Sequence, residues 1–198
     1  MLASIQHRLV ILAMPKCAST SFEAALSRDM DLVISKHPGA KHTNFRKYHR
    51  HLKRFLENLA EGPMETVCMF REPVSWLHSW WRYRSRPGIP DPSRSTEGID
   101  FERFVELYID GARAPANLGR QSRFVAAADG SIGVDRLFRY DRVDELCAFL
   151  SERLDREVVL ERRNVSPSAH AAEELSLDVR DRLHDHLLLD FEIYQSLA

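Results

Sequence analysis

A lysine and three hydroxyl side chains gather in a short segment near the start of the sequence. Lys16, Ser19, Thr20 and Ser21 follow an apolar run at residues 9–14 and precede an amphipathic segment. This order predicts a strand, a tight loop and a helix whose first backbone N–H groups point into the loop and favour an anion. The lysine adds a full positive charge, and the hydroxyls add donors. The segment therefore predicts a binding site for a phosphate or sulfate group.

This loop differs from the phosphate-binding loop of common nucleotide-binding proteins. That motif, G-x-x-x-x-G-K-[ST], needs glycines that let the backbone wrap the phosphates, and residues 15–21 contain no glycine. In the alternative interpretation the segment is an ordinary strand, turn and helix, in which Pro15 breaks the strand and Ser19 caps the helix.

A second apolar run also ends in residues suited to bind an anion. Residues 66–70 are apolar or β-branched, and Arg71, Glu72 and Pro73 follow them. Pro73 suits the first turn of a helix, so Arg71 would stand at the carboxyl end of a strand, where open α/β sheets bind ligands. Its guanidinium matches a phosphate, and Ser79 in the following helix adds a hydroxyl. Alternatively, Arg71 pairs with Glu72 or another acid.

Together the two segments resemble the sulfotransferases that use 3′-phosphoadenosine 5′-phosphosulfate (PAPS). Residues 15–21, Pro-Lys-Cys-Ala-Ser-Thr-Ser, are similar to that family's 5′-phosphosulfate loop, roughly P-K-x-[GA]-[ST]-[ST]-[ST]. Residues 71–73, Arg-Glu-Pro, with Ser79 are similar to its 3′-phosphate motif, R-[DE]-P with a serine eight residues after the arginine. Weaker similarities extend the likeness over most of the chain.

The likeness is closest to the carbohydrate-type branch, found in the Golgi and in bacteria, because the R-K-G-x-x-G signature of the phenol and steroid branch is absent. The resemblance implies a P-loop-like α/β fold and a metal-free enzyme that takes PAPS as donor and releases the desulfated bisphosphate (PAP). The residues that would bind the 5′-phosphosulfate are Lys16, Cys17, Ala18, Ser19, Thr20 and Ser21. Arg71 and Ser79 would bind the 3′-phosphate.

Residues 36–54 form a basic segment without any acidic residue. It is a solvated helix face, a nucleic-acid contact helped by Phe45 and Tyr48, or an acceptor site for an anionic or sugar substrate with a histidine base. The family resemblance favours the acceptor site. The carbohydrate branch often places a histidine after the second strand in a K-H-x-x-[FL]-like setting, and residues 41–45 resemble it.

Sulfuryl transfer needs two groups from the protein. The acceptor hydroxyl must lose its proton, and a histidine with an ordinary pKa near ~6.5 suits this role. The leaving phosphate oxygen must have its charge stabilised, for which a lysine is suited. We therefore assign His42 as the base and Lys16 as the leaving-group stabiliser, with His37 and His49 as alternative bases. Some relatives use a glutamate base instead.

The pattern along the chain predicts an α/β protein with a central parallel sheet flanked by helices and a mostly helical C-terminal third. The predicted strands lie at residues 9–14, 32–35, 66–70 and 136–140. The predicted helices lie at residues 21–27, in the basic segment through residue 59, from residue 74, and at 100–110, 118–127 and 143–154. A loop rich in Pro, Gly and Ser at residues 85–98 is long enough to be functional.

Length and composition fit one domain over residues 1–198 with a full core. The net charge of -1 gives no reason to expect a nucleic-acid or membrane partner. The N-terminal apolar run is too short for a membrane span and lacks the pattern of a signal peptide. We therefore expect a cytoplasmic protein, as for a bacterial member of the family, that acts on a small-molecule or saccharide acceptor.

The three cysteines are far apart and odd in number, which argues against a disulfide framework or a zinc site. Cys68 and Cys147 lie in apolar patterns typical of a core. Cys17 lies beside Lys16, a position that favours its thiolate. Its simplest role is a small loop residue, and of the three cysteines it would be the alkylation-sensitive site.

Several later segments carry weaker signals. Residues 117–123 contain two arginines and are either a donor or acceptor contact or an exposed helix start. Asp141 is expected to cap the helix that follows it, with Tyr140 in a structural role. Residues 162–166 resemble a stretch near the adenine pocket of some relatives, or form a solvated loop. The terminal residues 190–194 resemble a helix that packs in the family.

Two other functions stay open at this point. A phosphoryl-transfer enzyme on the same framework would need magnesium and an acid to hold it, but Arg71 stands where that acid would be. A non-catalytic nucleotide-binding regulatory protein would keep the donor site and transfer nothing.

Overall fold

The computed structural model describes residues 1–89, 91–111, 114–160 and 175–197. The predicted adenine-pocket stretch at residues 162–166 lies outside the described residues. The chain divides into two compact units, of which the first contains Met1–Arg71 and Gln121–Asn164 and the second contains Glu72–Arg120 and Val165–Ser196. The prediction of one domain stays a prediction.

The first unit contains a five-stranded sheet with the strand order β3-β1-β2-β4-β5. The strands are β1 (Leu2–Ser4), β2 (Leu9–Leu12), β3 (Leu32–Val33), β4 (Glu65–Phe70) and β5 (Arg136–Arg139). Strands β2, β4 and β5 run parallel, whereas β1 is antiparallel to both of its neighbours. The expected α/β class with a parallel centre is confirmed. Strand β1 was not predicted, because three residues are too few for a pattern.

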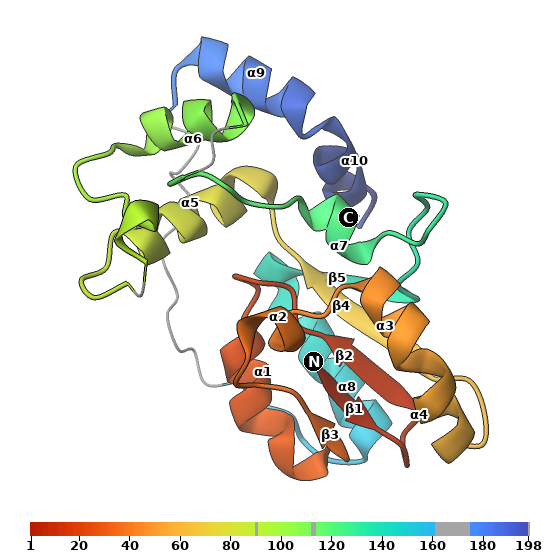
Figure 1. Cartoon of the computed structure of the whole chain (residues 1–198). Helices are drawn as coiled ribbons and strands as arrows, with labels where there is room; N and C mark the ends of the chain where they lie inside the picture. The colour runs from red at the N-terminus through yellow and green to blue at the C-terminus, as the bar shows by residue number, and fades with distance from the viewer. Residues whose placement is uncertain (90, 112–113, 161–174, 198) are drawn as a thin grey trace. The chain divides into compact units, whose positions relative to one another are not determined.

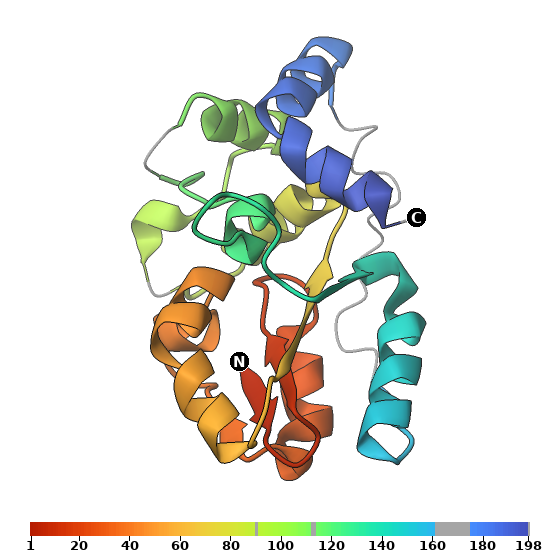
Figure 2. The same ribbon diagram turned by 90° about the vertical axis from the view of Figure 1, so that its right-hand side faces the viewer.

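Helices cover both faces of this sheet, which explains why the central strands read as continuous apolar runs. All four residues of β2 are buried, as are the last five of β4. Figures 1 and 2 show α3 and α4 on one face and α1 and α8 on the other. The helices of this unit are α1 (Ser19–Leu26), α2 (Pro38–Lys41), α3 (Phe45–His51), α4 (Lys53–Leu59), α7 (Gln121–Val125) and α8 (Val143–Leu154), with short 3₁₀ turns at Ser27–Asp29 and Tyr140–Arg142.

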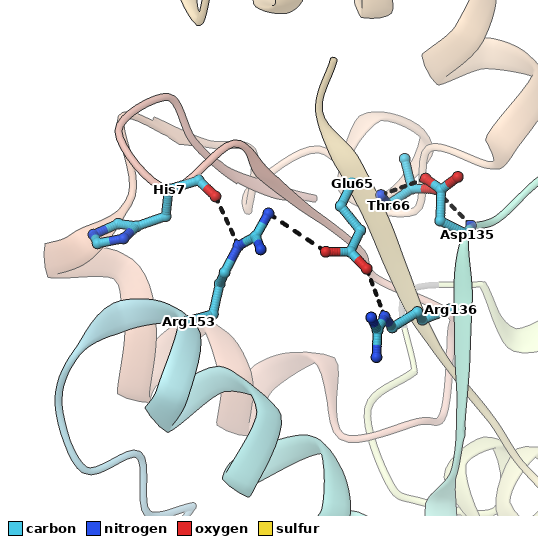
Figure 3. A network of polar contacts seen from close by, with 6 residues as sticks. All are labelled: His7, Glu65, Thr66, Asp135, Arg136 and Arg153. Carbon is cyan, nitrogen blue, oxygen red and sulfur yellow. Dashed lines mark hydrogen bonds and ion pairs between the residues drawn. The ribbon is translucent and has the colours of Figure 1, made fainter. Parts of the chain in front are cut away.

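A polar network fixes the register at the start of β4 and β5 (Figure 3). One oxygen of the Asp135 carboxylate accepts from the Thr66 amide at 2.7 Å and from the Thr66 hydroxyl at 2.6 Å, and the Asp135 amide donates back to that hydroxyl at 3.0 Å. Beside it, the Glu65 carboxylate pairs with Arg136 at 2.5 Å and with Arg153 of α8 at 3.4 Å. Arg153 also donates to the carbonyl of His7 at 3.0 Å. The network therefore joins β4, β5 and the turn between β1 and β2 to a covering helix.

The second unit is helical in its described part. The described residues of the C-terminal third are mostly helical, as predicted, because they contain α8 and the last two helices of this unit besides strand β5. The helices of the second unit are α5 (Pro73–Arg84), α6 (Phe101–Ile109), α9 (Leu177–His186) and α10 (Leu188–Ser196), with a 3₁₀ turn at Pro92–Arg94. Helix α5 begins as predicted, with Pro73 in its first turn, and the Glu72 carboxylate accepts from the amides of Val74 at 3.0 Å and Ser75 at 2.6 Å. The core includes an edge-to-face contact between the rings of His78 and Phe101, 4.9 Å apart.

Two local predictions need correction. The basic segment forms three short helices rather than one, because His42 and Leu52 leave helical geometry at its two breaks. Asp141 does not cap α8. It lies in the preceding 3₁₀ turn and pairs with Arg139 at 2.7 Å, while Arg142 occupies the N-cap position without a side-chain cap.

The Thr66 hydroxyl should contribute measurably to stability. Thr66→Val keeps the side-chain shape but removes a buried hydrogen bond to a charged carboxylate, an interaction that contributes about 1.5–3 kcal/mol. We expect the free energy of unfolding, measured by urea denaturation, to fall by about 2 kcal/mol. Arg136→Gln is the control: it removes an exposed ion pair and should cost less than about 1 kcal/mol. Equal losses in the two variants would contradict the role given to this network.

Candidate active site

The loop between β2 and α1 has a backbone suited to bind an anion. Lys16 and Ala18 have φ angles of 65° and 55°, in the left-handed region. This conformation is unfavourable by roughly 1–2 kcal/mol for a residue with a Cβ atom, and such strain clusters at ligand sites. Turns of this kind direct successive backbone N–H groups to one side and form a concavity for anions. The loop reaches this geometry without a glycine.

Helix α1 presents its first backbone N–H groups to the same loop. The helix begins at Ser19, and its N-cap is Ala18, which offers no side-chain cap. The interpretation of Ser19 as the N-cap is therefore wrong, because the left-handed turn at Ala18 brings Ser19 into the helix. Ser19 is half-buried, Thr20 is exposed and Ser21 is buried. The open N–H groups of this helix terminus and the hydroxyls of Ser19 and Thr20 form the accessible donor set.

Arg71 lies at the carboxyl end of β4, as predicted, and reaches back to the loop. Its side chain is buried, with 4% of the residue exposed. One guanidinium nitrogen donates to the carbonyl of Lys16 at 3.1 Å, and the guanidinium lies 4.3 Å from the centre of the Tyr140 ring. Arg71 therefore supports the strained backbone of the loop, and Tyr140 packs directly on this arginine.

Gln121 holds the end of β4 in place. This residue is fully buried at the start of α7. Its side-chain oxygen accepts from the Arg71 amide at 3.0 Å and from the Cys17 thiol at 3.8 Å, and its amide nitrogen donates to the Arg71 carbonyl at 2.7 Å. Sequence reasoning missed this role, because residues 117–123 were interpreted as an exposed helix start or as a donor or acceptor contact made by the two arginines. A lone glutamine carries no pattern that would reveal it.

His42 lies against the same loop. It follows α2, and its Nδ1 atom is 2.6 Å from the carbonyl oxygen of Ala13, three residues before Lys16. A carbonyl only accepts, so Nδ1 carries the hydrogen and Nε2 of the neutral ring keeps its lone pair. Burial lowers the pKa of His42, the bond to Ala13 opposes this, and the charges of Lys41 and Lys16 lower it further. The ring is therefore held neutral and suited to accept a proton.

The residue before His42 is also anchored. The ammonium group of Lys41 pairs with the Glu23 carboxylate of α1 at 2.8 Å. This pair joins the His42 segment to the helix that starts at the anion loop. The alternative bases His37 and His49 are exposed.

Ser79 belongs to the second unit, on α5, so its contribution to the donor site stays a prediction. Lys16, Cys17, Ala18, Ser19, Thr20, Ser21, Arg71 and His42 all belong to the first unit, which brings them together at the ends of β2 and β4. Among the described residues, no group of three or more His, Cys, Asp or Glu side chains is placed to hold a metal ion.

The expectation that Cys17 is a reactive thiol is wrong. The residue is buried, with 3% exposed. Burial raises the pKa of its thiol to about 12, although the charges of Arg71 and Lys16 act in the opposite direction. The thiol faces Gln121 rather than solvent, so at this position Cys17 can contribute its backbone to the loop.

Comparison with known proteins identifies the family of the chain. The chain matches the model of the sulfotransferase family over residues 1–195, whereas no curated protein matches it. Because the match covers nearly all of the sequence, the chain belongs to the sulfotransferase family. It is a transferase whose general chemistry is sulfuryl transfer. In the part of the chain that the structure describes, none of the helices is both long and apolar enough to cross a membrane.

The burial of Cys17 has a direct chemical consequence. Treatment of the native protein with iodoacetamide at pH 8 should label Cys147 first, because it alone of the three cysteines is partly exposed. Cys17 and Cys68 should react only after unfolding in urea, since both thiols are buried and the reagent cannot reach them. Burial raises the thiol pKa of all three cysteines, so exposure decides the order. Peptide mass spectrometry over time measures the order. Fast labelling of Cys17 in the native protein would overturn its assignment as a buried thiol.

Proposed function

We propose that this protein transfers a sulfuryl group from PAPS to a hydroxyl acceptor without a metal ion. The observation that carries the proposal is the convergence of the Lys16 loop, the Arg71 side chain and His42 within one unit. Two phosphate-binding groups and a neutral histidine are the set that such a transfer requires. The residues present fit the donor, because the left-handed loop and the start of α1 offer N–H groups and a lysine to an oxyanion.

When bound, PAPS supplies the sulfuryl group and a phosphate leaving group, and PAP is the product. The backbone of Ala18 and the start of α1, with the hydroxyls of Ser19 and Thr20, holds the 5′-phosphosulfate. Ser21 is buried and its amide donates to the Ala18 carbonyl, and the Cys17 amide donates to the Met14 carbonyl at 3.4 Å, so these two residues shape the loop. Lys16 stabilises the charge on the leaving phosphate oxygen by preorganised electrostatics. Arg71 holds the 3′-phosphate through charge-assisted hydrogen bonds. The part of Ser79, which belongs to the second unit, rests on the family resemblance alone.

His42 takes the proton from the acceptor hydroxyl at its Nε2 atom. The bond from Nδ1 to Ala13 supports this role, because it fixes both the tautomer and the direction of the ring. The acceptor that fits best is a polar hydroxylated molecule such as a saccharide. The basic segment that contains His42 and the resemblance to the carbohydrate-type branch support this class. A cytoplasmic location in a bacterial cell is part of the same proposal. A substrate screen in which only phenols are sulfated would contradict the acceptor class.

The donor assignment predicts tight binding of PAP without magnesium. Calorimetry should show PAP binding that is unchanged by a chelator, with ATP and magnesium binding more weakly. Lys16→Gln and Arg71→Lys should each weaken PAP by roughly 10- to 100-fold, because each loses a charge-assisted contact worth about 1.5–3 kcal/mol. Arg71→Lys keeps the buried charge but loses the planar fork that a phosphate and the Lys16 carbonyl share.

Arg28→Gln serves as the control, because it removes an exposed cation from the far end of α1. Its PAP affinity should equal that of the wild type. Preference for magnesium-ATP would favour a phosphoryl-transfer enzyme. PAP binding without turnover on a broad acceptor panel would favour a non-catalytic nucleotide-binding protein.

The histidine assignment predicts an unusual pH profile. The base works only when neutral, and the pKa of His42 lies below its ordinary value of 6.5. The value of kcat/KM should therefore stay constant as the pH falls through 6.5 and should decline only at lower pH. His42→Ala should lower kcat by about 10²- to 10⁴-fold with the fold intact. His49→Ala is the matched control at an exposed histidine, and a loss of turnover there instead would reassign the base.

A further inference from the structure

Helices α3 and α4 both carry exposed basic side chains, and α4 also carries exposed apolar ones. The helices are separated at Leu52, which leaves helical geometry and forms the last hydrogen bond of α3, to Tyr48 (2.9 Å), and the first of α4, from Leu56 (3.0 Å). The exposed residues are Lys47, Arg50 and His51 on α3 and Arg54, Phe55 and Leu59 on α4. All six side chains are exposed, and we call them the α3–α4 surface.

The charge of this surface has one sign. The only acidic residue in the sequence of residues 45–59 is Glu57. Its carboxylate pairs with Lys53 and accepts from the amide of Met64 at 3.2 Å. Within the described ranges no acidic side chain forms an ion pair with Lys47, Arg50 or Arg54, so their charges face solvent. A chain with a net charge of -1 therefore presents a locally cationic helix face.

Two large apolar side chains complete the surface. Phe55 is 61% exposed and Leu59 is 55% exposed, one turn apart on α4. They are directed away from the buried side of these helices, where Phe45, Tyr48 and Leu56 pack in the core. Soluble polyanions such as nucleic acids and polysaccharides satisfy cations but offer little to an aliphatic Leu59. The boundary between lipid headgroups and acyl chains takes both kinds of side chain.

From this pairing of solvent-facing cations with exposed apolar side chains, we propose that the α3–α4 surface docks the protein onto membranes rich in anionic lipids. Lys47, Arg50 and Arg54 contact the headgroups, and Phe55 and Leu59 enter the interface. The sequence expectation of no membrane partner rested on the net charge and on the short N-terminal apolar run, and neither reports the charge of a local surface. The inference does not depend on the proposed donor or on the base.

Vesicle co-sedimentation tests the proposal. The full-length protein should bind vesicles of one-third phosphatidylglycerol in phosphatidylcholine, fail to bind pure phosphatidylcholine, and lose binding as salt rises. Arg50→Gln with Arg54→Gln should lower the partition coefficient roughly 30-fold, at about 1 kcal/mol per cation near an anionic surface. Phe55→Ser with Leu59→Ser should also weaken binding but leave its salt dependence unchanged.

The matched control is Arg28→Gln with Arg142→Gln, which removes two exposed cations outside the α3–α4 surface and should bind vesicles like the wild type. PAP affinity should be unchanged in all of these variants, which separates this test from that of the proposed function. Absence of binding to anionic vesicles, equal loss in the control, or binding to dextran sulfate or DNA without binding to vesicles would each overturn the proposal.

Discussion

The side-chain amide of Gln121 binds both backbone groups of Arg71, and the candidate site depends on this interaction. Its bonds of 3.0 and 2.7 Å extend the ordered backbone of β4 past its last strand residue. The guanidinium of Arg71 then donates to the carbonyl of Lys16, a residue held in the left-handed region. Strain of this kind persists only where the surroundings over-determine it. The ends of two parallel strands are thereby fixed against each other, and the anion loop keeps its open shape without a glycine.

The hydrogen bonds between Gln121 and Arg71 also explain how the other groups of the site are arranged. The Cys17 thiol faces the same glutamine oxygen, which turns it inward and leaves the loop's backbone for a ligand. On the other side of the loop, Ala13 receives the hydrogen bond of His42. The proposed base and the proposed anion site therefore both depend on one short stretch of backbone, residues 13–18. The family match supplies the general chemistry, sulfuryl transfer, and the positions of these side chains support the roles proposed for them.

Much of this arrangement could be predicted from local sequence patterns. Buried parallel strands leave continuous apolar runs, so β2 and β4 and the residues just after them were recognised, and α8 was placed at its observed bounds. Features that depend on distant partners were not recognised. Strand β1 is defined by its pairing with β2 and β3. The role of Gln121 depends on its hydrogen bonds with Arg71, fifty residues away at the end of β4. The prediction of a reactive Cys17 was wrong for the same reason. The sequence shows the neighbouring charges of the thiol but not its burial.

The affinity of a folded Gln121→Leu variant for PAP tests the central claim most directly. Leucine keeps the apolar volume near that of glutamine but leaves the Arg71 amide and carbonyl without their partner. The variant should retain cooperative unfolding, at reduced stability, and bind PAP about tenfold more weakly, the equivalent of one net hydrogen bond. An affinity equal to that of the wild type would mean that the hydrogen bonds between Gln121 and Arg71 stabilise the fold without organising the donor site.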